Sequence, residues 1–403
     1  MKDRIGICAA LCAACAAVAI ADPDGAELFR QVQAKILDAI RRAPRYTCVQ
    51  TVERAQYLPL YGALPPNCAA MIAARKQIMS PGVLVWRDRL RLDVAVLEGE
   101  ETFSWAGAKR FETTRVDELV ASGALGNGEF TAFLTSVFAG EADVVSFSGP
   151  SLFTFEMPIA RSHFTYHSRG GAARTVAYHG SFRVDPEGAE LKRLTIVADQ
   201  FPSDESTCRI EDAMDYHIVK IGNGEFLLPW VATMDILYSN GSESVNETRY
   251  SQCREYTGES TIHYGDDAEA PPATMPGSAA PRHFSQPSTP PGLLFHIALT
   301  SPIHSDTAAA GDLVDGLVLE DVRDAARDVI ARANDVVHGR ILRIEQFPGP
   351  GARWMLGIRF DTLEHDGAET PVSLKLAEGD VFTFRQAGKL DLDQTFRTDW
   401  ETR

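Results

Sequence analysis

The sequence has no excess of basic residues, and this limits the partners that it can bind. Its 403 residues include 39 Lys and Arg against 55 Asp and Glu, which gives a formal net charge of −16 at pH 7. Nucleic acids are bound by basic surfaces, and the average field around this chain repels a phosphate backbone. We therefore expect no nucleic-acid partner.

Signatures of catalysis are also missing. The sequence contains no Gly-x-Ser-x-Gly elbow, P-loop, dinucleotide-binding glycine fingerprint or catalytic-cysteine context. The carboxylates Glu98, Glu100 and Glu101 surround Gly99, and we interpret them as a solvated turn because nothing apolar is at hand to raise one pKa. These absences predict a protein that is not an enzyme and that needs no cofactor.

Residues 1–21 differ from everything that follows. Lys2 and Arg4 precede an uncharged stretch that closes on a small-x-small site at 19–21. This is the layout of a secretory signal peptide, although an uncleaved anchor helix or lipidation of Cys15 would also use such a segment. No later stretch is long and apolar enough to span a bilayer. We expect a periplasmic or secreted protein with no transmembrane span in the mature chain.

Four cysteines remain after the signal peptide, namely Cys48, Cys68, Cys208 and Cys253. An even number in an exported chain predicts two disulfides, and four cysteines permit three pairings. We favour Cys48–Cys68 with Cys208–Cys253, because each pair lies within one run of neighbouring elements. A zinc site is the alternative, but no two of the four have the close spacing that places two thiolates on one metal.

A long strand is predicted over 84–96, because apolar residues there alternate with charged ones. The charged face carries Arg87, Arg89 and Arg91, and only Asp88 breaks the alternation. We interpret the arginine row as a solvent-exposed strand face. As a site, it would meet an acidic partner or a lipid headgroup.

The remaining pattern predicts two folded parts. A helix is expected from Asp24 to before Pro44, and strands with readable turns between 151 and 264 indicate an antiparallel meander. Residues 265–291 contain seven prolines and predict a stiff, solvated linker. Short strands over 292–403 then predict a small all-β domain.

Two resemblances add to this outline. Several segments of the N-terminal part are similar to uncharacterised exported bacterial proteins. These segments are Tyr46-Thr47-Cys48, Cys68, the run over 176–186, Phe226-Leu227-Leu228-Pro229 and Cys253-Arg254-Glu255-Tyr256. The strand–Asp-Pro–turn–strand unit resembles the outer-membrane lipoprotein carrier (LolA-like) superfamily. Over 22–264 this resemblance implies a strongly curved antiparallel sheet with helices on its concave side, a fold associated with the carriage of hydrophobic ligands.

The second resemblance covers the C-terminal part. Three segments look like the β-barrel of conjugation and secretion scaffold proteins of the TrbI type. They are Leu299-Thr300-Ser301-Pro302-Ile303, Ala310-Gly311-Asp312 and Val337-His338-Gly339-Arg340. This resemblance implies a barrel-like domain over 292–403. The predicted fold class is α+β and mainly β, with a curved sheet followed by a small barrel.

Two groups of residues are candidates for a site. Phe130, Phe133, Leu134 and Phe138 recur at helical spacing after Gly126-Asn127-Gly128, and Trp86 lies on the apolar face of the long strand. They form either a packed core or the wall of a cavity for an acyl chain.

Three histidines form the other group. His163 and His167 would share one strand face, and a turn at Gly170-Gly171 would place His179 opposite His163, as a zinc site requires. Solvent-facing strand histidines are the simpler interpretation, so no metal site is assigned.

Three functional hypotheses follow. The first is a non-enzymatic envelope protein that binds a lipid or another hydrophobic ligand in its N-terminal domain. The second is an interaction or scaffold protein, without a ligand, whose sheet is filled by its own side chains and whose partner is an envelope protein. The third is a metal-dependent hydrolase that uses His163, His167 and His179.

Overall fold

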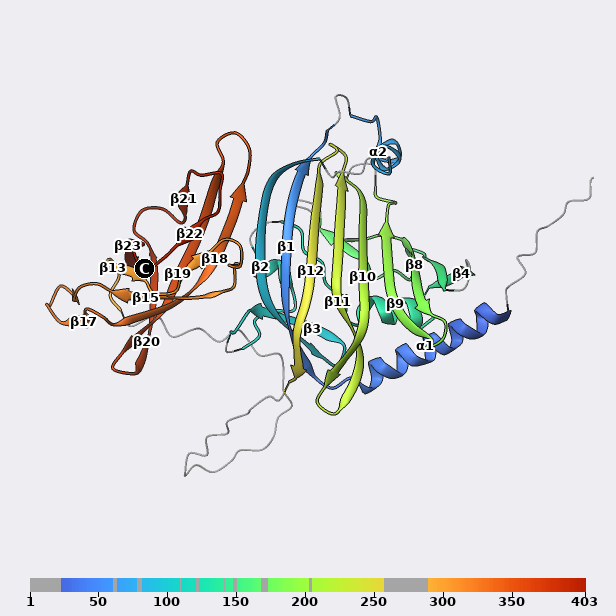
Figure 1. Ribbon diagram of the computed structural model, residues 1–403, viewed down its shortest axis with the longest axis horizontal. Helices are drawn as coiled ribbons and strands as arrows, with labels where there is room; N and C mark the ends of the chain where they lie inside the picture. Colours follow the sequence, from blue (N-terminus) through green and yellow to red (C-terminus); the bar gives the residue numbers. More distant parts are fainter. Residues whose placement is uncertain are drawn as a thin grey trace, which may run out of the picture.

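The computed structural model describes residues 23–60, 64–77, 82–108, 110–120, 123–140, 142–147, 151–167, 173–202, 205–256 and 289–403. The predicted signal peptide, the Gly170-Gly171 turn and most of the predicted linker lie outside these residues. Within them the protein is mainly β, as predicted, and its buried apolar side chains form two large clusters. One cluster belongs to an N-terminal sheet and the other to a C-terminal barrel (Figure 1).

The N-terminal part is one antiparallel sheet in the spatial order β4, β5, β8, β9, β10, β11, β12, β1, β2, β3. Its strands are β1 (Tyr46–Leu58), β2 (Val83–Leu97), β3 (Glu100–Trp105), β4 (Asp143–Phe147), β5 (Leu152–Met157), β8 (Tyr178–Asp185), β9 (Glu190–Ala198), β10 (Thr207–Ile221), β11 (Gly224–Tyr238) and β12 (Glu243–Glu255). Nearly all neighbours along the chain are neighbours in space, as a meander predicts. There are three exceptions: β3 and β4 follow each other in the chain but lie at opposite edges of the sheet, β1 pairs with β12, and β6 (Thr165–His167) forms a separate hairpin with β7 (Ala173–Thr175).

Helices cover one face of this sheet, which we call the inner face. The predicted N-terminal helix forms as α1 (Pro23–Arg42), and it buries Val32 and Ile36 against the sheet. Arg41 and Arg42 occupy its last turn, where positive charge suits the helix dipole. The second packing helix is α3 (Ala132–Phe138), which lies against α1. A third helix, α2 (Cys68–Arg75), contacts β10 at the end of the sheet where β10 begins (Figure 1).

The C-terminal part contains a closed barrel of six strands. Its order is β13, β15, β18, β19, β20, β23, and β23 pairs with β13 to close it. These strands are β13 (Leu294–Leu299), β15 (Leu313–Val318), β18 (Val336–Phe347), β19 (Arg353–His365), β20 (Ala368–Leu376) and β23 (Arg397–Thr402). Short strands complete it: β14 (Ile303–His304) with β22 (Asp391–Leu392), β16 (Val322–Arg323) with β17 (Val329–Ala331), and β21 (Phe382–Phe384) on β19. The expectation of a β-barrel in this part is confirmed.

Among the described residues, no helix combines the length and the apolar character needed to cross a membrane.

Strand β2 joins the sheet to the barrel. Its second half pairs with β3, from Leu92 to Leu97, so its first half leaves one edge open. The barrel covers that edge: β18 pairs with β2 at Asp88, and the N–H of Arg91 donates to the carbonyl of Ala310 at 2.7 Å. A side chain on Gly311, whose φ is +108°, would collide with the Arg91 carbonyl. The predicted solvent-exposed strand face is therefore, in part, a contact between the two parts.

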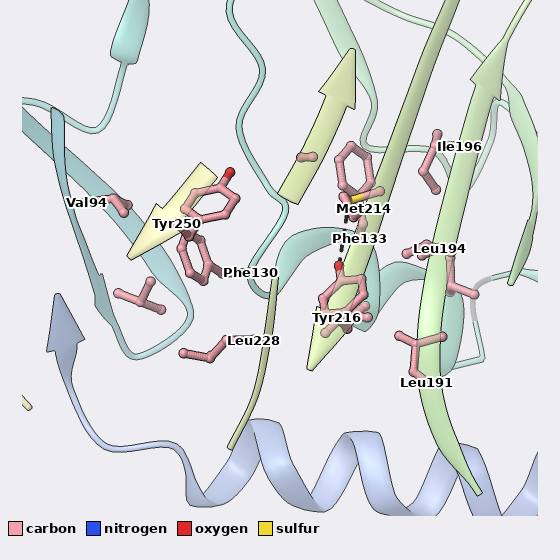
Figure 2. Close-up of a cluster of buried hydrophobic side chains, with 14 of the residues drawn as sticks. Val94, Phe130, Phe133, Leu191, Leu194, Ile196, Met214, Tyr216, Leu228 and Tyr250 are labelled. Carbon is pink, nitrogen blue, oxygen red and sulfur yellow. Dashed lines mark hydrogen bonds between the residues drawn. The ribbon is translucent and has the colours of Figure 1, made fainter. Parts of the chain in front are cut away.

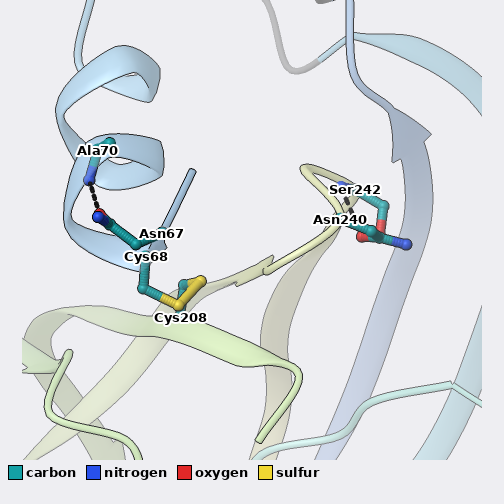
Figure 3. Close-up of a disulfide and its surroundings, with 6 residues drawn as sticks. All are labelled: Asn67, Cys68, Ala70, Cys208, Asn240 and Ser242. Atoms are coloured by element: carbon teal, nitrogen blue, oxygen red, sulfur yellow. Dashed lines mark hydrogen bonds between the residues drawn. A yellow bond between two sulfur atoms is a disulfide. The ribbon is translucent and has the colours of Figure 1, made fainter. Parts of the chain in front are cut away.

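The predicted disulfide pairing is wrong. The structure joins Cys48 to Cys253 and Cys68 to Cys208. Our pairing assumed that cysteines close in sequence are close in space, but β1 pairs with the distant β12 and brings the Cα atoms of Cys48 and Cys253 to 4.1 Å. The second disulfide ties the first residue of α2 to β10, beside the Asn67 side chain that accepts a hydrogen bond from Ala70 and caps this helix (Figure 3).

Peptide mapping under non-reducing conditions tests this pairing. We expect linked peptides that contain Cys48 with Cys253 and Cys68 with Cys208. The two bonds close loops of 205 and 140 residues, so each stabilises the fold by about 5 kcal/mol in the loop-entropy account. Reduction should therefore lower the midpoint of urea unfolding strongly. A Cys48–Cys68 peptide would contradict the strand order described above.

Candidate functional site: a buried polar row under a glycine-rich strap

The predicted apolar ligand residues lie together, but they are packed. Phe130, Phe133 and Phe138 are 2%, 9% and 0% exposed, and Leu134 is equally buried. The ring of Phe138 lies 5.0 Å from that of Phe182, and the ring of Phe130 lies 4.8 Å from that of Tyr250. Figure 2 shows Phe130 and Phe133 among the other side chains of this buried cluster. This half of the inner face is filled by the protein's own side chains.

Trp86 does not lie with these phenylalanines. It is on the first half of β2, and the guanidinium of Arg54 lies over its ring at 5.2 Å. A cation over an indole face is an attractive arrangement. Trp86 therefore belongs to a polar region of the inner face.

The register that would place His179 opposite His163 is not observed. His163 precedes β6, and β6 pairs with β7 rather than with β8, which carries His179. His179 is opposite Glu156 and Val197 in the main sheet, and its Nε2 lies 3.3 Å from Asp199. Within the part of the chain that the structure describes, no group of three or more His, Cys, Asp or Glu side chains is arranged to hold a metal ion.

A row of polar side chains crosses the inner face instead. Asp88 on β2 is the register partner of Arg54 on β1, which is opposite Asn246 on β12. Asn246 is opposite Met234 on β11, which is opposite Asp212 on β10. Arg54, Asn246 and Asp212 are each at least 97% buried. We call this set the polar row.

One end of the polar row is fully paired. Arg54 donates to both carboxylate oxygens of Asp88, at 2.8 and 2.5 Å, and the two side chains are 1% and 5% exposed. Burial raises the pKa of Asp88, while the hydrogen bonds from Arg54 act in the opposite direction. Breaking such a buried pair by removing one partner costs about 3–5 kcal/mol, because the other charge stays buried.

An irregular segment covers the rest of the row. We call residues 123–131 the strap, and this segment contains neither helix nor strand. Four hydrogen bonds attach it to the sheet. Asn246 Nδ2 donates to Ala124 O at 2.8 Å, and the N–H of Gly128 donates to Glu101 at 2.9 Å. The hydroxyl of Tyr216 donates to Glu129 O, and that of Thr131 donates to Gly99 O, both at 2.7 Å.

Glycines let the strap lie close to the polar row. Gly123 has φ +86°, and a Cβ there would sit 2.5 Å from the guanidinium of Arg54. A Cβ on Gly126 would lie 3.2 Å from Glu129 Oε1 and 3.7 Å from Asp212 Oδ2. The strap thus touches both ends of the row, and Gly126 lies directly against two carboxyl groups.

Three carboxyl groups lie at the strap, two of them on the sheet (Glu101 and Asp212) and one on the strap itself (Glu129), and burial raises the pKa of each. Burial and the neighbouring Glu101 raise the pKa of Asp212 to about 7. Burial, followed by the charges of Asp212 and Glu101, raises the pKa of Glu129 well above its usual range. Glu101 as a residue is half-buried, but its carboxylate is enclosed and accepts hydrogen bonds from Gly128 and Phe130. The interpretation of Glu101 as part of a solvated turn is therefore wrong.

Several buried polar atoms on the strands that carry the polar row have no hydrogen-bond partner in the described structure. They are Asp212 Oδ1, Asn246 Oδ1, Gln50 Oε1 and the hydroxyl oxygen of Tyr250. Burial raises the pKa of Tyr250 well above its usual range, and the charges of Glu129, Glu101 and Asp212 raise it further. Leaving a buried polar group unpaired costs about 1–3 kcal/mol. Such a concentration of unpaired groups marks this region as the candidate site.

The sequence contains a signal for this site that none of the predictions above includes. Asp88 stands at the one position that breaks the alternation of its strand. Asp212 stands between Ile210 and Met214 at the spacing of one strand face, and Glu101 shares its parity with buried Phe103. A polar residue at an apolar position on each of several strands is the pattern that would have predicted the row.

No protein-family model, no curated protein and no solved structure matches this chain.

The carboxyl group of Asp212 should make stability depend on pH. Its pKa is about 7 in the folded protein against an ordinary 3.8, so the folded state binds this proton more tightly than the unfolded state does. The stability that results is fully present below about pH 4 and is lost as pH rises through 7. We therefore expect the melting temperature of Asp212→Asn, minus that of wild type, to be higher at pH 8 than at pH 5. One kcal/mol corresponds to about 2–4 °C for a domain of this size, and we expect a difference of several degrees.

Asp215→Asn is the matched control, because Asp215 lies on the same strand but pairs with Arg193 on the other face. Its melting-temperature difference from wild type should be similar at both pH values. Equal behaviour of the two variants would show that Asp212 is not enclosed as described.

Proposed function

We propose that the protein is a non-enzymatic, extracytoplasmic interaction scaffold built from a sheet domain and a barrel domain that β2 holds together. The observation that carries this proposal is the filled apolar half of the inner face, where Phe130, Phe133 and Phe138 pack against the protein's own rings. A carrier of acyl chains needs an apolar space of several hundred Å³. The packing therefore favours the scaffold hypothesis over lipid carriage.

The disulfides support the location. Two disulfides indicate an oxidising, extracytoplasmic environment, because cytosolic thiols are kept reduced. Together with the signal-like residues 1–21, they favour the periplasm or secretion. Helices on one face of an antiparallel sheet, and a closed barrel after it, are compatible with the resemblance to LolA-like and TrbI-type domains. The partner we propose is an envelope protein.

The contact between the two parts supports a fixed arrangement. Arg89 Nη1 donates to the carbonyl of Asp306 at 2.7 Å, and Arg91 forms an ion pair with Asp312. Arg87 donates to Gln346 Oε1 at 2.6 Å. Each arginine of the row thus has a partner on the barrel, and backbone hydrogen bonds at Ala310 add to them. A scaffold presents surfaces at a defined spacing, which such a contact provides.

A charge exchange tests whether this contact holds the two parts together. Arg91→Glu or Asp312→Arg alone should separate the barrel from the sheet, because like charges about 4 Å apart near a protein surface repel by about 4 kcal/mol before side chains relax. We expect a larger maximum dimension in small-angle X-ray scattering for each single variant. The double variant restores opposite charges and should return to the wild-type dimension.

The control for this experiment is Arg193→Glu, since Arg193 pairs with Asp215 within the sheet, away from β2. It should leave the dimension unchanged. If the single variants scatter like wild type, the pair of Arg91 and Asp312 does not hold the barrel in place; if wild type itself scatters as a range of arrangements, the proposal of a rigid scaffold fails.

Lipid uptake separates the scaffold from a carrier. We expect the purified protein to show no saturable binding of a fluorescent fatty acid. Phe133→Ala should lower the free energy of unfolding by about 3–5 kcal/mol, as for a packed core ring. The exposed Ile218 provides a control, and Ile218→Ala should change stability by about 0.5 kcal/mol or less. Saturable uptake by the wild type would restore the carriage hypothesis.

A further inference from the structure

We propose that the strap covers a binding site for a small organic cation, a primary ammonium compound, which Asp212, Glu129 and Tyr250 hold. This proposal concerns the polar half of the inner face, and it stands whether or not the scaffold proposal does. The apolar half is satisfied by its own packing, whereas the polar half contains groups that the chain itself leaves unpaired.

The unpaired atoms define the chemistry of the ligand. Asp212 Oδ1, Asn246 Oδ1 and Gln50 Oε1 are acceptors, and the Tyr250 hydroxyl can accept as well as donate. Each of these residues is more than nine-tenths buried. Gln50 and Tyr250 are opposite each other four residues along the strands from Arg54 and Asn246, so one ligand atom bonds to part of this set, and whatever part it meets requires hydrogen-bond donors from it. An ammonium group supplies three N–H donors from one atom.

The charge of the surroundings agrees with a cation. Glu101, Glu129 and Asp212 are close enough that neighbouring negative charge raises the pKa of Glu129 and of Asp212, so these groups disfavour an anion and favour a positive charge. The charges that shift the pKa values of Glu129 and Asp212 are those of carboxylates, whereas Arg54 donates twice to Asp88 at the other end of the row.

Aromatic rings complete the site. The rings of Tyr250 and Phe130 meet edge to face at 4.8 Å, and the ring of Tyr46 lies 5.9 Å from that of Phe130. Tyr216 adds a fourth buried ring beside the strap (Figure 2). The face of an aromatic ring attracts a cation, and here such rings stand beside carboxyl groups that can pair with its N–H donors.

A metal ion fits less well. A site for calcium or magnesium needs several carboxylate oxygens around one point, and the described residues contain no group of three acidic, His or Cys side chains so arranged. An ammonium ligand has no such requirement, because it bonds along separate N–H directions and makes van der Waals contact with rings.

Access requires the strap to lift. It is irregular, it contains Gly123, Gly126 and Gly128, and side-chain contacts from the sheet attach it. Gly126 lies against Asp212 Oδ2, and Glu129 belongs to the strap itself, so lifting the strap uncovers Asp212 while Glu129 moves with the strap. A buried site that opens when one segment moves is accessible only in a minor conformation of the protein, and a bound ligand stabilises that conformation.

Binding should be linked to protons. Asp212 must lose its proton before it can pair with an ammonium ion, and its pKa without a ligand is about 7. The affinity should therefore rise with pH up to about 8. Protons should leave the protein when the ligand binds, so the measured heat should depend on the ionisation enthalpy of the buffer.

Isothermal titration of the full disulfide-bonded protein with propylammonium chloride tests the proposal. We expect saturable binding at pH 8 that is at least tenfold weaker at pH 5.5. Asp212→Asn should weaken it at least tenfold, and Tyr250→Phe should weaken it several-fold. Gly126→Ala places a methyl group against the carboxyl pair without changing any charge, and it should also weaken binding.

Two controls separate this site from general attraction of cations to an acidic protein. Asp235→Asn removes another carboxylate with an unpaired buried oxygen, on β11 beside Arg209, and it should leave binding unchanged. Tetramethylammonium has no N–H donor and should bind at least tenfold more weakly. The proposal is overturned if propylammonium shows no saturable binding, if Asp212→Asn and Asp235→Asn weaken binding equally, or if tetramethylammonium binds as well.

Discussion

The buried pair of Arg54 and Asp88 lies where the main parts of the structure meet. Asp88 is on the half of β2 that has no β3 beside it, and its backbone pairs with Glu345 of the barrel on the edge left open. An exposed strand edge invites pairing with other chains, so its coverage by the barrel also removes a risk of aggregation. Arg54 meanwhile lies under Gly123 of the strap. The sheet, the barrel and the strap are thus connected through one ion pair.

The inner face has two halves with different physical character. In the apolar half, rings from α1, α3 and the strands exclude water, and burial of each ring stabilises the fold by roughly 1.5–3 kcal/mol. In the polar half, burial disfavours the charged form of the carboxyl groups, which is why their pKa values rise. The strap belongs to both halves, because Phe130 packs into the apolar half while Glu129 faces the polar half.

Local periodicity predicted the elements, but it did not predict which elements meet. The helix after Asp24 and the long strand over 84–96 were recoverable because burial imposes a period on each of them. The disulfides were not, because the pairing of β1 with β12 depends on closure of the meander over some two hundred residues. Glu101 was misplaced for a related reason. Its sequence neighbours are polar, whereas the groups that enclose it come from the strap and from β10.

The polar row has a cost in stability that its structural role explains only in part. Replacing a buried ion pair with apolar residues is often neutral or stabilising, so buried charges need a separate reason to be retained. Arg54 and Asp88 have one, because a fully paired contact fixes the register of β1 against β2 next to the barrel. Asp212 and Tyr250 lack such a reason, since unpaired atoms fix no register. Their chemistry is accounted for if they serve something that the chain itself does not supply.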